Sequence, residues 1–207
     1  MTIPTAIADR MERIGPRLYW WHVQDDRIGG AQSDSYALDT GRGVIFVDPL
    51  PITHRGADRF PSVAFVFLTT AGHQRASWRY RMELGARIWA PRESVGLVGE
   101  PDRRFIEQTP FPNDFRAVFT PGRGLSHYAF LRSGDPSILF VGDLVTRRDA
   151  HSPLQLPAGA REERPAVSRR SVERLLTLDF DLLCLSHGGM IDDDPRGALR
   201  ELLERGV

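Results

Sequence analysis

Hydrophobic and β-branched residues in the first third of the chain occur in short runs that predict β-strands. The runs Leu18–Val23, Ser35–Leu38 and Val44–Val47 are of this kind, and the glycine-containing segment Asp39–Gly43 predicts a hairpin turn between the last two. A continuous apolar run, Val63–Leu68, predicts a strand that is buried on both faces. The chain is therefore expected to begin with a β-sheet.

A helix comes next, and the second half of the chain then repeats the layout of strands followed by helices. The pattern predicts a helix over Gln74–Leu84 with Gly85 as its C-cap. Further strands are expected at Arg87–Ala90, Arg116–Phe119, His127–Leu131, Ser137–Val141 and Leu182–Leu185, further helices at Ser168–Leu178 and from Asp194 to Leu203, and loops at Arg92–Asn113 and Arg147–Arg164. This order predicts helices packed on mixed or antiparallel sheets.

Composition limits the kinds of partner that the protein can bind. The length of 207 residues suits one ordinary globular domain, so a single domain over residues 1–207 is expected. All 27 basic residues are arginine, and 27 acidic residues balance them to a net charge of zero. Nucleic-acid binding needs a concentrated positive face, so no nucleic-acid partner is expected. The absence of lysine also excludes lysine Schiff-base chemistry and a P-loop lysine.

Cysteine usage and the N-terminal sequence predict a cytoplasmic protein. The single cysteine, Cys184, excludes an internal disulfide and a multi-cysteine zinc site. The segment Met1–Arg10 lacks the pattern of a signal peptide, and the longest apolar run is far too short to span a membrane. No membrane partner is therefore expected. The four tryptophans could supply the interface of a homo-oligomer: Trp20, Trp21, Trp78 and Trp89.

Polar residues follow several of the predicted strands, where α/β proteins commonly place ligand sites. In chain order, these segments are Phe46-Val-Asp48, Leu68-Thr-Thr-Ala-Gly-His-Gln-Arg75, Phe119-Thr-Pro-Gly-Arg123, Phe140-Val-Gly-Asp143 and Leu185-Ser-His187-Gly. Their order and spacing resemble the metallo-β-lactamase superfamily over about residues 17 to 203. The resemblance implies an α/β (α+β) fold, the four-layer αββα sandwich of two mixed β-sheets with helices outside, in which the family binds one or two metals between the sheets.

The departures from the family pattern concern the metal ligands. Carried over by position, the histidines and the aspartate of the family's His-x-His-x-Asp-His motif fall on Thr70, Gly72, Gln74 and Arg75, and the histidine of its Thr-Pro-Gly-His turn falls on Arg123. Only Asp143 and His187 match ligand positions. Arginine stays protonated and repels a cation, and a zinc site needs at least three protein ligands. The resemblance therefore implies a degenerate metal site with no metal cofactor.

We expect an arginine-lined pocket in place of the dimetal site. Its residues would be Thr70, His73, Arg75, Arg123, Asp143 and His187, with a guanidinium paired to Asp143 and a small anionic molecule as ligand. The alternative is a hydrolase of esters, thioesters or phosphoesters. It would use one zinc or other divalent ion on His73, Asp143 and His187, or metal-free acid/base catalysis by Asp143 and His187. A structural role is also open for three of these residues. His73 would be hydrogen-bonded near the helix start, His127 would act in packing or an edge hydrogen bond, and Asp143 would cap a helix or turn.

Overall fold

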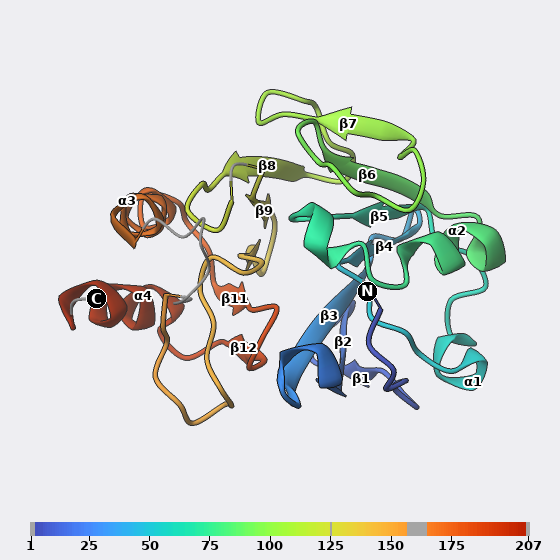
Figure 1. Ribbon diagram of the computed structural model, residues 1–207, viewed down its shortest axis with the longest axis horizontal. Helices are drawn as coiled ribbons and strands as arrows, with labels where there is room; N and C mark the ends of the chain where they lie inside the picture. The colour runs from blue at the N-terminus through green and yellow to red at the C-terminus, as the bar shows by residue number, and fades with distance from the viewer. Residues whose placement is uncertain (1–2, 125, 157–164, 206–207) are drawn as a thin grey trace. The chain divides into compact units, whose positions relative to one another are not determined.

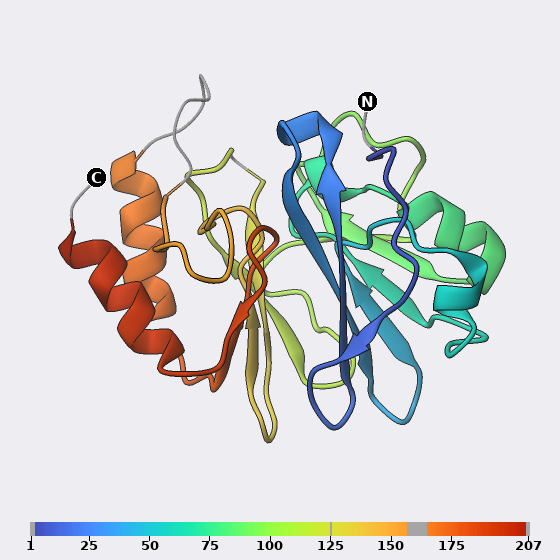
Figure 2. The same ribbon diagram turned by 90° about the horizontal axis from the view of Figure 1, so that it is seen from below.

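The computed structural model describes residues 3–124, 126–156 and 165–205, and the predicted loop Arg147–Arg164 lies partly outside them, at 157–164. The chain divides into two compact units, Met1–Phe105 and Ile106–Val207. Each unit is built on one β-sheet (Figures 1 and 2). Among the described residues, no helix has both the length and the apolar character that a membrane span requires.

The first unit contains a seven-stranded mixed sheet whose strands are adjacent in chain order. They are β1 (Glu12–Arg13), β2 (Leu18–Asp25), β3 (Ala31–Asp39), β4 (Val44–Val47), β5 (Phe65–Phe67), β6 (Arg87–Pro91) and β7 (Arg103–Phe105). Pairing is antiparallel from β1 to β4 and parallel from β4 to β7. The predicted hairpin is confirmed as β3–β4. Because β4 and β5 are parallel neighbours, their carboxyl ends lie at the same edge of the sheet.

Two helices belong to this unit, the short α1 (His54–Ala57) and α2 (Ser77–Leu84), which contacts β6. The predicted helix begins three residues later than expected because Arg75, with a left-handed φ of 34°, separates it from a 3₁₀ turn at Ala71–His73. Gly85 caps α2 with φ 70°, as predicted. Tyr80 of α2 packs edge-on against Phe46 of β4 in the core of the unit, and its hydroxyl donates to the carbonyl of Leu50 at 2.6 Å.

The second unit contains a five-stranded mixed sheet in the order β12-β11-β10-β9-β8. The strands are β8 (Phe115–Phe119), β9 (Tyr128–Arg132), β10 (Ile138–Phe140), β11 (Leu182–Cys184) and β12 (Met190–Ile191). The β10–β11 pair is parallel and the other pairs are antiparallel. Helices α3 (Pro165–Leu175) and α4 (Pro195–Glu204) lie side by side against this sheet (Figures 1 and 2).

Apolar faces of α3 and α4 build the core of the second unit. Val172 and Leu175 of α3 and Leu199 of α4 are fully buried in one cluster with Leu139 and Leu183 of the sheet. The predicted start of the last helix is confirmed: Asp194 is the N-cap and accepts from the Gly197 amide at 2.8 Å, with Pro195 at the first helical position.

Short elements are where the fold departs from the sequence-based prediction. Strand β7 lies inside Arg92–Asn113, which was expected to be a loop, and β1, α1 and β12 were not predicted. Each has two to four residues. Such short elements carry no periodic pattern of their own and form because a neighbouring strand or the chain on either side supplies partners.

Candidate functional site

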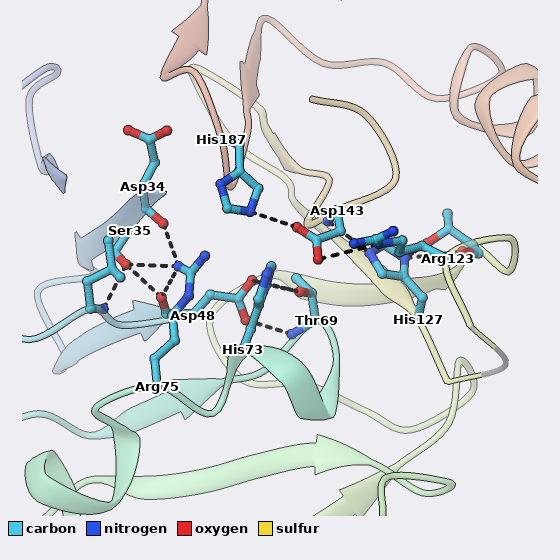
Figure 3. A network of polar contacts seen from close by, with 12 residues as sticks. Asp34, Ser35, Asp48, Thr69, His73, Arg75, Arg123, His127, Asp143 and His187 are labelled. Carbon is cyan, nitrogen blue, oxygen red and sulfur yellow. Dashed lines mark hydrogen bonds and ion pairs between the residues drawn. The ribbon is translucent and has the colours of Figure 1, made fainter. Parts of the chain in front are cut away.

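One candidate cluster lies in the first unit, at the adjacent ends of β4 and β5. We call Asp48, Thr69 and His73 the Asp48 cluster (Figure 3). Oδ1 of Asp48 accepts from the Thr69 amide at 2.8 Å, and Oδ2 accepts from the Thr69 hydroxyl at 2.6 Å. His73 Nδ1 lies 2.8 Å from the same Oδ2. These three contacts of the carboxylate orient groups of the segment that follows β5.

The protonation state of this cluster follows from its burial and its partners. Asp48 is 2% exposed, and burial alone raises the pKa of its carboxyl. The charge and hydrogen bond of His73, with smaller effects of Arg75 and Thr69, outweigh burial and hold the pKa of Asp48 below its ordinary value. The carboxylate is therefore ionised and His73 donates through Nδ1. Chemistry at His73 would go through Nε2.

Arg75 forms hydrogen bonds to the backbone of the sheet in the first unit. Its side chain is 1% exposed, and Nη1 donates to the carbonyls of Asp34 at 2.8 Å and Asp48 at 2.9 Å (Figure 3). Its backbone φ is 34°, an unusual value for a residue with a side chain. Arg75 therefore ties the end of β4 to β3. Its expected part in a ligand pocket stays a prediction.

The other positions that we expected to replace family ligands also have local roles. Gln74 is 1% exposed, and its side chain donates to the carbonyl of Gly96 at 3.0 Å and accepts from the Val98 amide at 2.7 Å. It also accepts from Trp78 Nε1 at 2.9 Å. The Gln74 amide thus anchors the loop after β6. Thr70 is half-buried and precedes the 3₁₀ turn without capping it through its side chain.

A second candidate cluster lies in the second unit. We call Arg123, His127, Asp143 and His187 the Asp143 cluster (Figure 3). Asp143 follows β10 and His187 follows β11, and these strands are parallel neighbours, so their carboxyl ends meet at one edge. His187 Nε2 lies 3.1 Å from Asp143 Oδ1, an ion pair when the imidazole is protonated, and Arg123 Nε lies 3.8 Å from Oδ2. We expected a guanidinium to pair with Asp143, and in this unit the guanidinium near its carboxylate is that of Arg123.

His127 holds the backbone at Asp143 through a hydrogen bond. It is fully buried, and its Nε2 accepts from the Asp143 amide at 3.1 Å. Nδ1 lies 3.1 Å from the carbonyl and 2.9 Å from the hydroxyl of Thr120. Since an amide can only donate, Nε2 must carry a lone pair, and the proton resides on Nδ1. The ring is therefore held as one neutral tautomer between Thr120 and Asp143.

The expected packing or hydrogen-bonding role of His127 is correct but incomplete, because sequence reasoning missed its contact with Asp143. The hairpin register indicates only the Thr120 contact of His127. Phe119 pairs with Tyr128, so the next pair outward is Thr120 and His127, and two polar residues facing each other at the end of a buried hairpin favour a shared hydrogen bond. The bond to Asp143, 16 residues later, has no such local signal.

Comparison with solved structures identifies the fold. The chain has the fold of the metallo-β-lactamase superfamily, and the expected αββα class with two mixed sheets is confirmed. A metallo-β-lactamase from Pontibacter korlensis matches with a TM-score of 0.72 at 16% identity, over 94% of this chain and 98% of that chain. A metallo-β-lactamase from Hirschia baltica matches with a TM-score of 0.73 at 13% identity, over 95% and 97%.

An archaeal metallo-β-lactamase superfamily protein from Sulfolobus tokodaii matches with a TM-score of 0.67 at 12% identity, over 90% of this chain and 85% of that chain. No protein-family model matches the chain, and no curated protein sequence matches it. Similarity at identities this low shows the shared fold, and any function has to be argued from the side chains of this chain.

Proposed function

We propose that this chain is a metallo-β-lactamase-fold protein without the dimetal centre of its fold, and that Arg123 binds a small anionic ligand. The pairing of Arg123 with Asp143 carries the proposal. A guanidinium is positively charged at all physiological pH values, so it compensates the Asp143 carboxylate where a metal ion would otherwise do so.

The donor set supports the absence of two metals. Glycine at position 72 offers no side-chain donor, and arginine at positions 75 and 123 offers only cations. Gln74 directs its amide to the loop after β6. A centre that needs six or more protein ligands for two ions does not fit these residues.

Accessibility and charge support the anion. The Arg123 side chain is 36% exposed, whereas those of Asp143 and His187 are 15% and 16% exposed, so a ligand from solvent meets the guanidinium first. A guanidinium offers a planar fork that fits carboxylate or phosphate oxygens. His187 adds a second positive charge when it is protonated. We therefore propose a carboxylate or phosphate group as the part of the ligand that Arg123 binds.

The second candidate is hydrolysis of an ester, thioester or phosphoester. Two observations favour it: the contact of His187 with Asp143, and the bond between Asp48 and His73 Nδ1, which is the arrangement that orients a histidine to act through Nε2. In the second unit, Asp143 and His187 offer donor types that suit a divalent ion, which when bound would polarise a carbonyl or phosphoryl oxygen. Without metal, Asp143 or His187 would act as general base on water.

Overall charge and the exposure of the tryptophans bear on macromolecular partners. A neutral overall charge favours neither nucleic acid nor an anionic membrane surface. For a homo-oligomer, Trp21 and Trp89 are unsuited because they are 1% and 8% exposed, so Trp20 and Trp78 remain as the half-buried candidates.

The proposal is tested by metal analysis and anion titration. Protein purified without a nickel column should contain well below one equivalent of zinc plus iron. Inorganic phosphate or acetate should bind the wild type and bind Arg123→Gln about tenfold more weakly, whereas the exposed helix variant Arg200→Gln should bind like the wild type.

Two results would favour the hydrolase instead. One is turnover of ester, thioester or phosphodiester substrates, with or without added Zn²⁺ or Mn²⁺, that disappears in His187→Ala. The other is near-stoichiometric metal that is lost in Asp143→Ala. Either result would overturn the binding proposal.

A further inference from the structure

His187 lies in a glycine-containing turn, whose ends are joined by a hydrogen bond from the Leu185 amide to the Gly189 carbonyl at 3.0 Å. The turn joins β11 to β12, and it includes Gly188 and Gly189 with φ of 95° and 85°. Two consecutive glycines have the largest conformational entropy of any residue pair in an unfolded or loosely held loop. A side chain on such a turn keeps a defined position only when other residues fix the backbone.

Arg147 donates four hydrogen bonds, and three of them fix this turn. Its amide donates to the His187 carbonyl at 3.2 Å and its Nε donates to the Gly188 carbonyl at 2.7 Å. Nη2 donates to the Met190 carbonyl at 2.6 Å, and Nη1 donates to the Ala150 carbonyl at 2.9 Å. All three guanidinium nitrogens thus act on backbone carbonyls, three of the four bonds reaching the His187–Met190 segment.

Close packing makes this arrangement specific to glycine at position 188. A Cβ placed on Gly188 would lie 2.4 Å from Arg147 Cγ and 2.5 Å from the Arg147 carbonyl oxygen. Real Cβ atoms do not approach so closely, so the backbone of Gly188 rests directly on the stem of Arg147. The turn and the arginine are therefore in contact along both the aliphatic stem and the guanidinium.

Arg147 also belongs to the segment that carries Asp143, four residues earlier. One end of the Asp143 cluster is held by His127, which accepts from the Asp143 amide. Arg147 joins the continuation of the same segment to the turn of His187. The 3.1 Å contact between Asp143 and His187 is thus held from both sides by hydrogen bonds to the backbone.

From this geometry we infer that Arg147 is a positioning residue, which sets the His187 imidazole against Asp143 without touching ligand itself. The inference rests on the proposed function insofar as the Asp143 cluster binds the ligand. Lysine cannot replace Arg147, because one ammonium cannot bond three carbonyls that lie around a planar fork. The two arginines thus have different roles: Arg123 binds the ligand, and Arg147 holds His187 in place.

The experiment follows the His187 ring by NMR and the binding of inorganic phosphate by calorimetry. In Arg147→Lys and Arg147→Ala, we expect the His187 ring signals to shift and phosphate affinity to fall about tenfold, while the His127 signals stay in place. Millimolar guanidinium chloride should restore both readouts in Arg147→Ala and leave Arg147→Lys unchanged. Arg148→Ala is the matched control, because Arg148 is the neighbouring residue and is exposed.

Gly188→Ala provides an independent variant that keeps the arginine. The added methyl group displaces the Arg147 stem, so the His187 signals should shift as in Arg147→Ala, with no rescue by guanidinium. Unchanged His187 signals in Arg147→Ala and Gly188→Ala, or equal shifts of the His127 signals, would overturn the inference. If wild-type protein binds no phosphate, the proposed function fails, and the NMR readouts still decide the role of Arg147.

Discussion

His73 and Asp48 form a buried pair in which Nδ1 of the histidine lies 2.8 Å from Oδ2 of the carboxylate. The two residues are 25 positions apart, and both side chains are almost completely buried, at 6% and 2% exposed. A buried charge is costly when its partner is removed, so the pair stabilises the end of the parallel strands β4 and β5 only as long as both members are present.

The first prediction concerns this pair. His73→Ala leaves the Asp48 carboxylate buried without its imidazole partner and should lower the free energy of unfolding by about 3 kcal/mol. Adding Asp48→Asn removes that charge, so the double variant should lose less than the sum of the single variants. A double-mutant cycle in urea measures the coupling, expected at about 1 to 3 kcal/mol.

The histidine control for this cycle is His54→Ala, because the His54 side chain is 81% exposed. Its stability should match that of the wild type within about 0.5 kcal/mol. Strict additivity of the His73 and Asp48 variants would show that the two side chains do not interact in solution.

The second prediction separates anion binding from hydrolysis at Asp143. An anionic ligand competes with the Asp143 carboxylate for Arg123, so Asp143→Asn should bind inorganic phosphate more tightly, by about tenfold. A hydrolase that uses Asp143 as a base or metal ligand would lose turnover in the same variant. Calorimetry and a substrate screen on one preparation distinguish the two. Weaker phosphate binding in Asp143→Asn would contradict a role of Arg123 as the anion site.

The third prediction concerns the turn that carries Arg123. Gly122 has φ 134°, and a Cβ there would lie 2.7 Å from the backbone nitrogen of Ser168 in α3. Gly122→Ala should therefore destabilise the protein by about 3 kcal/mol and weaken phosphate binding.

Gly124 offers a matched comparison within the same turn. Its φ of 87° is also positive, but a Cβ there would meet no atom of the described residues within 4 Å. Gly124→Ala should cost about 1 kcal/mol, from backbone strain alone. Equal losses in the two variants, measured by thermal or urea unfolding, would mean that contact with α3 does not hold the turn.

The fourth prediction is a pH dependence set by Asp25 at the end of β2. Its side chain is fully buried, which raises the pKa, but hydrogen bonds from Arg27 and Ser33 outweigh burial and lower it to about 2. A carboxyl whose folded pKa is depressed stabilises the fold above its unfolded pKa, near 3.8, and loses that contribution as the pH falls towards 2.

The contribution of Asp25 at neutral pH should be about 1 to 2 kcal/mol. Asp25→Asn should be less stable than wild type at pH 7, and the difference should shrink between pH 4 and pH 2. Urea unfolding at a series of pH values measures it. A difference that stays constant down to pH 2 would contradict the depressed pKa of Asp25.

Apolar strands, capped helices and the order of strand-end motifs were predictable from the sequence, because apolar runs, caps and turn residues are local signals. Strand β4 matches its predicted bounds, Val44–Val47, and α4 starts at its predicted N-cap, Asp194. The substitutions of the family ligands stay a prediction, made from the place that each residue occupies in a short motif.

The partners of the site residues were not predictable in the same way. Gln74 bonds to the segment Gly96–Val98, and Arg75 bonds to the carbonyl of Asp34, 41 residues earlier. Such contacts depend on the tertiary path of loops, which leaves no periodic signal in the sequence. The bond between His127 and Asp143 became evident only once the strand register was known.

The hydrogen bonds of Gln74 and Arg75 bear on what would follow from placing the metal ligands of the family pattern in this chain. Histidines at positions 70, 72 and 75 and an aspartate at position 74 would remove the amide that donates to the Gly96 carbonyl and the guanidinium that joins the end of β4 to β3. A carboxylate cannot donate to the Gly96 carbonyl, and one imidazole N–H cannot take over both carbonyl bonds of Arg75. The side chains at positions 74 and 75 therefore support the fold, and such substitutions would need compensating changes elsewhere in the first unit.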